Sequence, residues 1–465
     1  MARTMFDKVW DSHIVADLGD GWSLLHVDRH LLHDLSGGRA LTDVLERDLP
    51  VRHPELAFAT PDHAVSSAPD RARHGFPAGE RLRASLRGQS EATGIRFFDL
   101  GQDGQGIVHV MGPELGIVLP GLTLICGDSH TCTNGGLGAL AFGVGSSELT
   151  HALATQTLRQ RRPKRMRVRF EGAPGPGITP KDLVLHLIGR LGAAAGTGYA
   201  VEYAGSAIRA LGVEGRMTIC NLSIEMGAKI GMVAADDTTF EYIAGRRFAP
   251  KGALFDRAVQ HWRTLPTDEG AAFDREEVID AAAISPTLTW GTSPEHAIAI
   301  DQPIPDPAAA ADAAQGAAWR AALEYMDLTP GQTLAGTKVD WVFIGSCTNS
   351  RLSDLRDAAA IARGRHVAPG VQAWVVPGSE RVKRDAEAEG LDRVFLEAGF
   401  AWREAGCSMC VAANGERVGP GQRSVSTSNR NFVGRQGPGA RTHLASPAMA
   451  VAAAVNGAIT DVRRL

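Results

Sequence analysis

The sequence is short of cysteine, of unbalanced charge and of long apolar runs, and each shortage excludes a class of protein. Six cysteines among 465 residues are too few for a disulfide scaffold, which favours a reduced, intracellular setting. No apolar run reaches the length of about 18 residues that a membrane-spanning helix needs. The first residues, MARTMFDKVWDSH, mix charged and apolar residues, so we do not expect a secretory signal there. Together these features predict a cytoplasmic protein.

The charge balance argues against a nucleic-acid or membrane-surface protein. The chain has 48 basic and 52 acidic residues, a formal net charge of −4. One basic run, RQRRPKRMRVRF at 159–170, departs from this balance. Met166, Val168 and Phe170 alternate with arginines in it. This period of two predicts a half-buried strand with a solvated arginine face.

Short apolar runs alternate along the chain with longer stretches of helical periodicity. The runs 122–126, 339–347 and 371–378 predict strands, whereas 146–160 and 352–364 predict helices. This strand–helix–strand order predicts an α/β fold with parallel strands.

Two changes in composition predict domain boundaries. The segments 171–180 and 301–320 are rich in Pro, Gly or Ala. We therefore predict α/β domains over residues 1–170, 171–300 and 331–465, with a linker over 301–330.

Cys407 and Cys410 form a C-x-x-C pair in WREAGCSMCVAANG. Alone, this spacing fits a redox pair, half of a zinc site or part of an iron–sulfur cluster. Cys347 follows a predicted strand in FIGSCTNS, where an open α/β sheet binds its ligands. Three thiolates from two loops suit an iron–sulfur cluster better than zinc. With three cysteine ligands, one iron of a four-iron cluster stays open and acts as a Lewis acid.

The other three cysteines are candidates for a fourth ligand. Cys126 and Cys220 end apolar stretches, which is typical of small core residues. Cys132 lies in a polar loop and is the strongest of the three candidates.

Several long motifs occur in an order that resembles the aconitase family over nearly the whole chain. They are GSCTNSR and GCSMC, together with FATPDHAVS, GIVHVMGPELG, CGDSHTCTNGGLGALAFGVG, EGRMTICNLSIEMGAK, STSNRNFVGRQG and THLASPAMAVAAAV. The resemblance implies a three-domain aconitase-like core of α/β layers. It also implies one [4Fe–4S] cluster per chain at a domain interface, held by Cys347, Cys407 and Cys410.

The same resemblance implies a reaction and the residues that perform it. The reaction moves a hydroxyl between adjacent carbons by dehydration and rehydration, and 2-isopropylmalate of leucine biosynthesis is the expected substrate. The implied acid/base residues are Asp62, His63, His109, Asp128, His130 and Glu225. The implied substrate-binding residues are His33, Ser129, Asn221, Asn429, Arg430 and Arg435.

Three positions near the implied site depart from the family's usual residues. The chain has Asn134, Gly135 and Ala64 where His, Ala and Asn are usual. Citramalate, homocitrate and citrate therefore stay open as alternative substrates. A cluster-free RNA-binding role is a further alternative, which the near-neutral charge disfavours.

Longer aconitases have a fourth, swivelling domain, and from the resemblance we expect no counterpart of it in this chain. The resemblance implies that a separate small subunit supplies this domain in a heterodimer or larger hetero-oligomer. We expect no nucleic-acid or membrane partner.

Overall fold

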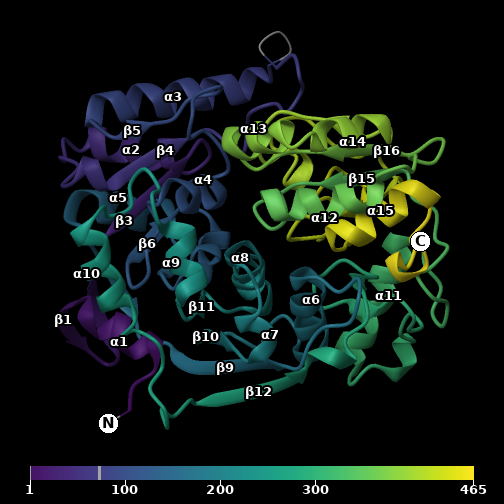
Figure 1. Ribbon diagram of the computed structural model, residues 1–465, viewed down its shortest axis with the longest axis horizontal. Coiled ribbons are helices and arrows are strands. Elements are labelled where there is room, and N and C mark those ends of the chain that lie inside the picture. Colours follow the sequence, from purple (N-terminus) through teal and green to yellow (C-terminus); the bar gives the residue numbers. More distant parts are fainter. Residues whose placement is uncertain (1, 72–74) are drawn as a thin grey trace. The chain divides into compact units, whose positions relative to one another are not determined.

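The computed structural model describes residues 2–71 and 75–465 (Figure 1). The chain divides into two compact units. Unit 1 comprises Met1–Val65, Pro77–Gly172 and Ala194–Ile279, and unit 2 comprises Ser66–Phe76, Ala173–Ala193 and Asp280–Leu465. Within the described residues, no helix combines the length and apolarity that crossing a membrane requires.

Unit 1 is built around a five-stranded parallel sheet of order β5-β4-β3-β6-β7. Its strands are β3 (Arg29–His33), β4 (Ala57–Thr60), β5 (Arg96–Phe97), β6 (Thr123–Cys126) and β7 (Leu140–Gly143). The helices α2 (Gly37–Glu46), α3 (Pro77–Thr93), α4 (Val108–Leu115) and α5 (Ser146–Thr155) accompany it (Figure 1). The chain leaves β3 toward β5 on one side and returns to β6 and β7 on the other. The strand order therefore reverses between β3 and β6, where an open α/β sheet forms its ligand crevice.

A second sheet in unit 1 has the order β11-β10-β9-β12. Its strands are β9 (Lys164–Glu171), β10 (Tyr199–Ala204), β11 (Ile230–Val233) and β12 (Arg275–Asp280). The helices α7 (Ser206–Arg209), α8 (Val213–Asn221), α9 (Asp237–Ile243) and α10 (Ala253–Trp262) belong to the same part of the chain. The strands β1 (Ile14–Gly19), β2 (Trp22–His26) and β8 (Thr157–Arg161) form a small antiparallel sheet. Helix α1 (Met5–Ser12) precedes β1 in the chain.

Unit 2 repeats the strand order of the first sheet. Its parallel sheet β17-β16-β15-β18-β19 consists of β15 (Trp341–Ile344), β16 (Gln372–Val375), β17 (Ala401–Trp402), β18 (Arg423–Ser426) and β19 (Arg441–Leu444). The order again reverses beside the first strand, here between β15 and β18. Both units therefore have one crevice of the same topological kind.

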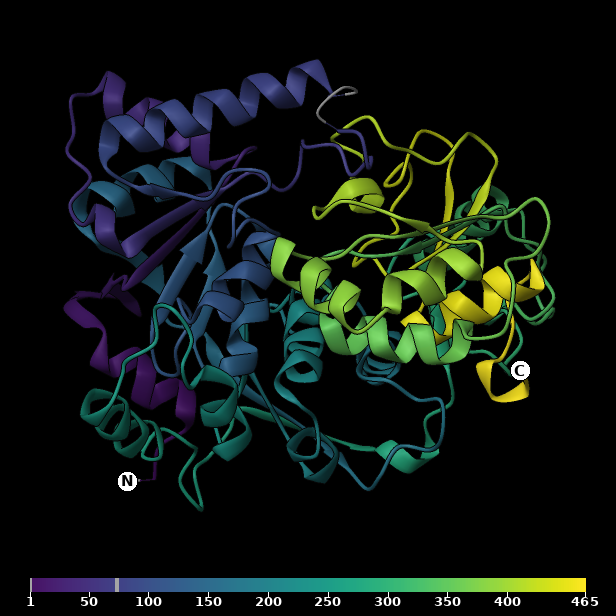
Figure 2. The same ribbon diagram turned by 45° about the horizontal axis from the view of Figure 1, so that its top comes forward.

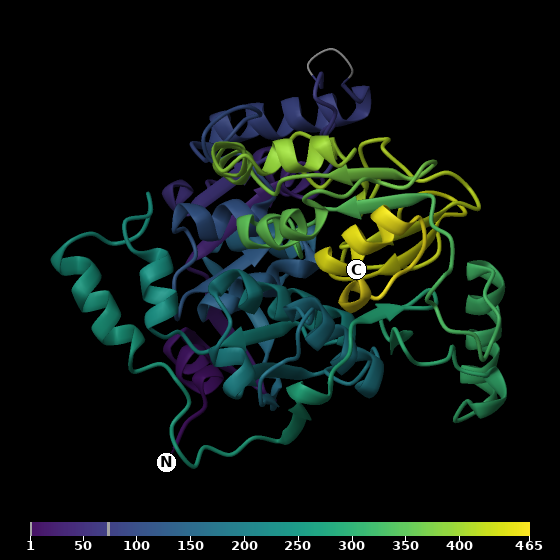
Figure 3. The same cartoon turned by 45° about the vertical axis from the view of Figure 1, so that its right-hand side comes forward.

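The helices of unit 2 include α12 (Leu352–Ala362), α13 (Glu380–Ala388), α14 (Leu391–Glu397) and α15 (Pro447–Asn456). Helix α12 packs against α14 and α15 (Figure 2). The remaining elements of this unit are α6 (Pro180–Leu191), β13 (Thr287–Thr289), β14 (Ala297–Ala299) and α11 (Ala313–Met326). Figure 3 shows α10 and α11 at the peripheries of their own units.

Most of the expected elements form where the periodicity predicts them. The runs predicted as strands contain β6, β15 and β16. Strand β9 alternates between buried and part-exposed residues, as its period of two predicts. The predicted helix 146–160 is wrong in its last third, from residue 156 onward. Gln156 adopts a left-handed conformation with φ of 60°, which ends α5. Residues 157–161 then pair with β2 as β8 because a neighbouring strand offers them hydrogen bonds.

The three predicted domains stay a prediction, because the division into two units follows a different criterion. The chain passes from unit 1 to unit 2 after Gly172, inside the Pro/Gly-rich segment, and returns to unit 1 at Ala194. The segment predicted as a linker, 301–330, contains the helix α11.

Gly135 generates the first prediction. A Cβ atom there would lie 1.7 Å from the carbonyl oxygen of Gly231 in β11, so the 3-10 helix Ser129–Leu137 packs backbone to backbone. We expect Gly135→Ala to lower the free energy of unfolding by roughly 3 kcal/mol, since neither backbone has room to move. Gly88→Ala is the control, because Gly88 is exposed in α3 with open space around it. It should raise stability by up to about 1 kcal/mol. Chemical denaturation measures both, and equal effects would contradict the packing argument.

Candidate active site

The acid/base residues of unit 1 gather where three strands of its main sheet end. His33 is the last residue of β3, Asp62 follows β4, and Asp128 follows β6. Because the strands are parallel, their carboxyl ends meet at one edge, beside the reversal of strand order. The parallel strand order therefore places His33 and Asp128, nearly 100 positions apart in the sequence, at the same edge of the sheet.

Carboxylates and imidazoles alternate across this edge. The Asp62 carboxylate forms a short hydrogen bond with His63 Nδ1, and the other ring nitrogen of His63 lies 3.2 Å from Asp128 Oδ2. Asp128 Oδ1 lies 3.4 Å from His130 Nδ1, and His130 Nε2 lies 2.7 Å from Glu225 Oε1. The result is a chain of five groups in the order Asp, His, Asp, His, Glu. Each imidazole has a carboxylate on both sides.

Asp128 is the centre of this chain. Burial alone would raise the pKa of its carboxyl group, but the imidazoles of His109, His130 and His63 outweigh burial and hold the pKa well below its usual range. The backbone N–H of His130 also donates to Asp128 Oδ1 at 2.7 Å. Asp128 is therefore ionised throughout the physiological pH range.

Asn134 fixes the tautomer of His109. Its side-chain amide donates to the Thr131 carbonyl at 2.9 Å and lies 3.2 Å from His109 Nδ1. A carbonyl only accepts, so the NH₂ group of Asn134 must point this way and His109 Nδ1 must be the acceptor. Neutral His109 then carries its proton on Nε2, which lies 3.7 Å from Asp128 Oδ1. The residue that departs from the family pattern thus touches an expected catalytic histidine.

Asn221 and Glu225 lie in two successive helices of different type. Helix α8 ends at Asn221, and Glu225 lies in the 3-10 helix Leu222–Met226 that follows. The side-chain amide of Asn221 donates to Thr133 at 2.7 Å. The change of helix type turns Glu225 toward His130.

Asp34 is a site residue that the sequence predictions missed. It is buried, and it accepts the backbone N–H groups of His63 at 3.1 Å and Ala64 at 2.8 Å. Asp34 thereby holds the turn that presents His63, and it follows His33 directly in the chain. Its position beside a strand-end histidine was the available signal.

The group His33, Asp34, Asp62 and His63 has ligand atoms within 4.8 Å of one another, which is close enough for a metal ion. The carboxylates are already engaged. Asp34 accepts from the backbone, and Asp62 accepts the N–H of Val108 at 3.0 Å as well as His63. Both carboxylates are therefore committed to contacts within the chain. The His33 and His63 rings stack with centroids 4.3 Å apart.

The three predicted cluster cysteines lie together in unit 2. Cys347 follows β15. Cys407 caps the start of the 3-10 helix Ser408–Cys410, and Cys410 is its last residue. The side chain of Asn429, which follows β18, contacts both loops. Its amide donates to Cys347 Sγ at 3.3 Å, and its oxygen accepts from Cys410 Sγ at 3.6 Å. These residues again lie beside the strand-order reversal of their sheet.

The donor set around the sulfur atoms fits an anionic cluster. The Arg435 guanidinium donates to Cys410 Sγ at 3.8 Å, as the Asn429 amide does to Cys347 Sγ, and Cys410 Sγ itself donates to Ser346 Oγ at 3.2 Å. The three thiols are buried and free of disulfides. Hydrogen-bond donors aimed at thiolate sulfur are the usual surroundings of iron–sulfur clusters. The residues present therefore fit the group that the sequence predicts.

The other three cysteines are placed as small buried side chains. Cys126 belongs to the core of unit 1, and Cys220 is fully buried in α8. Cys132 also lies in unit 1, where its thiol donates to the carbonyl of Asn221 at 3.5 Å. Burial raises the pKa of the Cys126 and Cys220 thiols well above its usual range, so both stay protonated.

Glu416 is a second residue that the sequence predictions missed. Its carboxylate accepts from Ser408 Oγ at 2.6 Å, from Ser67 Oγ at 2.6 Å and from the Arg403 guanidinium at 3.0 Å. Burial would raise its pKa, but the hydroxyls and Arg403 lower it overall. Glu416 thus anchors the turn between Cys407 and Cys410. It lies in a Gly/Asn-rich stretch that reads as an ordinary loop, so the sequence carried no signal for it.

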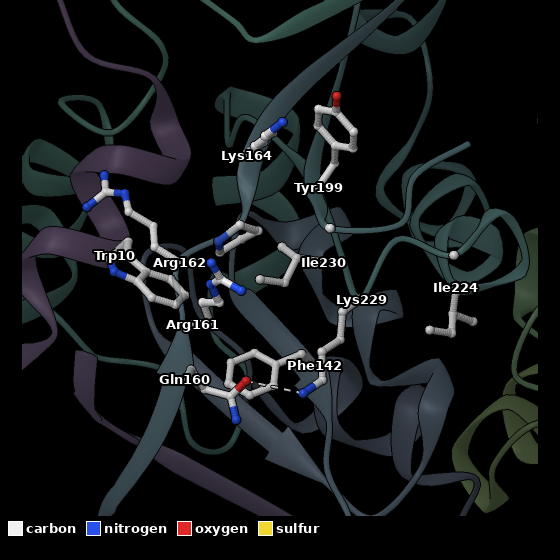
Figure 4. Close-up of a pocket in the computed structure, with 13 residues that line it drawn as sticks. Trp10, Phe142, Gln160, Arg161, Arg162, Lys164, Tyr199, Ile224, Lys229 and Ile230 are labelled. Atoms are coloured by element: carbon white, nitrogen blue, oxygen red, sulfur yellow. Dashed lines mark hydrogen bonds between the residues drawn. The ribbon is translucent and has the colours of Figure 1, made fainter. Parts of the chain in front are cut away.

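A cavity of about 660 Å³ in unit 1 lies apart from these residues (Figure 4). Trp10, Phe142 and Ile230 give it an apolar lining, and Lys229 donates to Gln160 at its side. None of the predicted site residues lines it. Strand ends, and not this cavity, therefore identify the candidate site.

Comparison with known proteins now adds to the geometry. The family model described as Aconitase family (aconitate hydratase) matches residues 7–457. The chain belongs to the aconitase family. It is 66% identical over 463 residues to 3-isopropylmalate dehydratase large subunit 1 of Bradyrhizobium diazoefficiens, which spans 100% of this chain and 97% of that protein. A solved structure, holo aconitase X of Thermococcus kodakaraensis, aligns with a TM-score of 0.47 and 13% identity over 92% of this chain and 89% of its own.

Family membership confirms the resemblance drawn from the motifs, and the structure adds where each residue lies. Unit 1 brings together His33, Asp62, His63, His109, Asp128, Ser129, His130, Asn221 and Glu225. Unit 2 brings together Cys347, Cys407, Cys410, Asn429 and Arg435, and Arg430 follows Asn429 in the same loop. Their roles stay proposals.

The electrostatics of Asp128 predict a pH dependence. Its pKa is lower in the folded chain than the usual value near 3.8, so its contribution to stability is complete above that value. The contribution is lost as the pH falls through 3.8 toward the lower folded pKa. We expect Asp128→Asn to cost roughly 3 kcal/mol at pH 6, because the imidazoles of His63, His109 and His130 lose their charged hydrogen-bond acceptor, and clearly less at pH 3. Urea denaturation of both chains at the two pH values measures this difference. A constant difference would contradict the assignment.

The contacts of Glu416 predict the behaviour of the cysteine turn. Glu416→Ala removes the acceptor of Arg403 and of three hydroxyls, and we expect a loss of roughly 3 kcal/mol of stability. We also expect faster reaction of Cys407 with a soluble thiol reagent, because its turn loses an anchor. The matched control is Glu389→Ala, since Glu389 pairs with Arg356 at the surface of the same unit. Equal thiol reactivity in the two variants would argue against an anchoring role.

Proposed function

We propose that this chain is the large, cluster-bearing subunit of a 3-isopropylmalate dehydratase. Such an enzyme is a hydro-lyase of leucine biosynthesis that interconverts 2-isopropylmalate and 3-isopropylmalate through 2-isopropylmaleate. The observation that carries the proposal is the 66% identity, over the full chain, to a protein of that name. The alternating carboxylates and imidazoles of unit 1 support it, because the reaction requires proton transfer.

The reaction determines what these side chains must do. Dehydration removes a proton from one carbon and a hydroxyl from its neighbour, and rehydration returns them in exchanged positions. Hydroxide is a poor leaving group, so it must be protonated and depart as water. His63 and His130 each lie between two carboxylates, so each ring nitrogen has a partner with which it can exchange a proton. We assign them, with His109, to holding and delivering the protons.

The cysteines of unit 2 are proposed to hold one [4Fe–4S] cluster. Cys347, Cys407 and Cys410 would supply the three protein ligands and leave one iron without cysteine. When bound, the cluster supplies a Lewis acid for the substrate hydroxyl and a carboxylate. Arg430 and Arg435 are assigned to the substrate carboxylates, since a planar guanidinium matches a carboxylate with two parallel hydrogen bonds.

Isopropylmalate is the proposed substrate, and other hydroxy di- and tricarboxylates are the alternatives. Asn134 takes the place of a usual histidine and contacts His109, and Gly135 beside it allows the closest backbone approach to β11. Ala64 is buried and donates its N–H to Asp34. These differences favour testing the same chemistry on citramalate, homocitrate and citrate.

A separate small subunit is proposed as the partner. The similar protein from Bradyrhizobium diazoefficiens is called a large subunit, which implies a small one beside it. We propose that the small subunit carries the swivel domain, that the assembly is a heterodimer or a larger hetero-oligomer, and that it is cytoplasmic. The formal net charge of −4 supports the absence of a nucleic-acid partner.

The cluster proposal predicts the outcome of anaerobic reconstitution with iron and sulfide. Three thiolates should bind about four irons per chain, with the visible absorption of a four-iron cluster and the electron paramagnetic resonance signal of its three-iron form after mild oxidation. Cys347→Ser should lose both signals, whereas Cys220→Ser should keep them because Cys220 is a core residue. Bound zinc in place of iron, or an intact cluster in Cys347→Ser, would refute the proposal.

Turnover of the reconstituted chain, with and without the small subunit, tests the enzyme itself. Hydration of 2-isopropylmaleate should require both chains and exceed the rates with citramalate, homocitrate and citrate. Full activity of the large chain alone would contradict the two-subunit proposal. Faster turnover of another substrate would replace isopropylmalate and keep the reaction class.

A further inference from the structure

Lys181 in α6 is a fully buried lysine close to the cysteine site. Lysine is among the residues least often buried completely, because its ammonium must give up water. Its Nζ donates to the carbonyl oxygens of Thr427 at 3.0 Å and Ser428 at 2.6 Å. Among the described residues, no carboxylate lies within ion-pair distance of it.

The two carbonyl groups that Lys181 contacts belong to the turn after β18. The next residue of that turn is Asn429, whose side chain donates to Cys347 Sγ at 3.3 Å and accepts from Cys410 Sγ at 3.6 Å. Lys181 therefore holds the backbone immediately before the residue that joins the two cysteine loops.

The charges around Lys181 identify what offsets its burial. Burial lowers the pKa of Lys181 to about 7, and negative charge at Cys410 and Cys347, followed by Asp354 and Asp182, would act in the opposite direction. The nearby carboxylates of Asp182 and Asp354 are engaged elsewhere. Asp182 accepts from the N–H of Thr287, and Asp354 accepts from the N–H of Arg351. Burying an ammonium without a compensating charge costs several kcal/mol of stability. Because the nearby carboxylates are engaged elsewhere, the proposed sulfur ligands are the groups left to compensate the charge of Lys181.

We propose that Lys181 is a positioning residue and the counter-charge of the cysteine site. Its ammonium fixes the turn 427–429 against Cys347 and Cys410 and offsets the negative charge of the sulfur ligands. The charge part of this inference rests on the proposed function, because it concerns the bound cluster. The positioning part concerns the chain without the cluster.

A purely structural lysine is the alternative, and three variants separate the two roles. Lys181→Met removes both the hydrogen bonds and the charge, Lys181→Gln keeps donors without charge, and Lys181→Arg keeps donors and charge. The control is Lys383→Met, which removes the same net charge from the surface of the same unit, where Lys383 pairs with Glu387.

The charge role is tested by redox titration of the reconstituted cluster, followed by electron paramagnetic resonance. A nearby cation stabilises the more negative, reduced cluster. Losing it in Lys181→Met and Lys181→Gln should therefore lower the equilibrium constant for reduction about tenfold, which is about 59 mV for one electron. Lys181→Arg and Lys383→Met should stay close to the wild-type chain. A native potential in Lys181→Gln would overturn the counter-charge role.

The positioning role is tested on the cluster-free chain by hydrogen–deuterium exchange. Amides in the 427–431 segment should exchange several-fold faster in Lys181→Met than in wild type, and Lys181→Arg should restore protection. Native protection in Lys181→Met would overturn this role, and so would unfolding of the entire chain in Lys181→Met without local change in Lys181→Gln. The iron content of the wild-type chain decides the proposed function separately, since a chain without iron refutes the cluster and leaves the exchange result intact.

Discussion

Burying charge requires compensation, and the candidate site depends on how each unit provides it. In unit 1 the Asp128 carboxylate is buried among His63, His109 and His130, which lower its pKa far enough to keep it ionised. Removing any one imidazole would leave the others facing an undercompensated anion. The strand ends, the 3-10 helix after β6 and the turn held by Asp34 all serve to keep these rings in place. The contacts that position these rings are therefore also the contacts that stabilise this part of unit 1.

In unit 2 the compensating groups lie near sulfur atoms that are proposed to carry negative charge. These groups are the Arg435 guanidinium, the Asn429 amide and the Lys181 ammonium, which binds the carbonyl of the residue before Asn429. The two units thus place compensating groups beside the strand-order reversals of their sheets. A single strand order serves both purposes because the crevice lies where adjacent connections diverge.

The sequence predicted the parts of this arrangement that local patterns encode. Strand–loop–helix order placed Cys347 and Asp128 after buried strands, and the period of two identified β9 as a half-buried strand. Motif order identified the family. It did not reveal Asp34, Glu416 or Lys181, because each acts through contacts with residues distant in the chain. A lone buried lysine in a helix looks like any other helical lysine in the sequence.

The same reasoning explains why the departures from the family pattern could be noticed but not interpreted from the sequence. Gly135 was an unexplained change until the carbonyl of Gly231 was seen to leave no space for a Cβ atom. Asn134 acquires meaning from the single acceptor that Thr131 presents, since that acceptor orients the amide and the amide then selects the tautomer of His109. A histidine at this position has two ring nitrogens that exchange donor and acceptor roles with pH, whereas an amide does not. The substitution therefore replaces a titratable neighbour of His109 by a fixed one, and it removes one route by which pH would alter the proton that His109 holds toward Asp128.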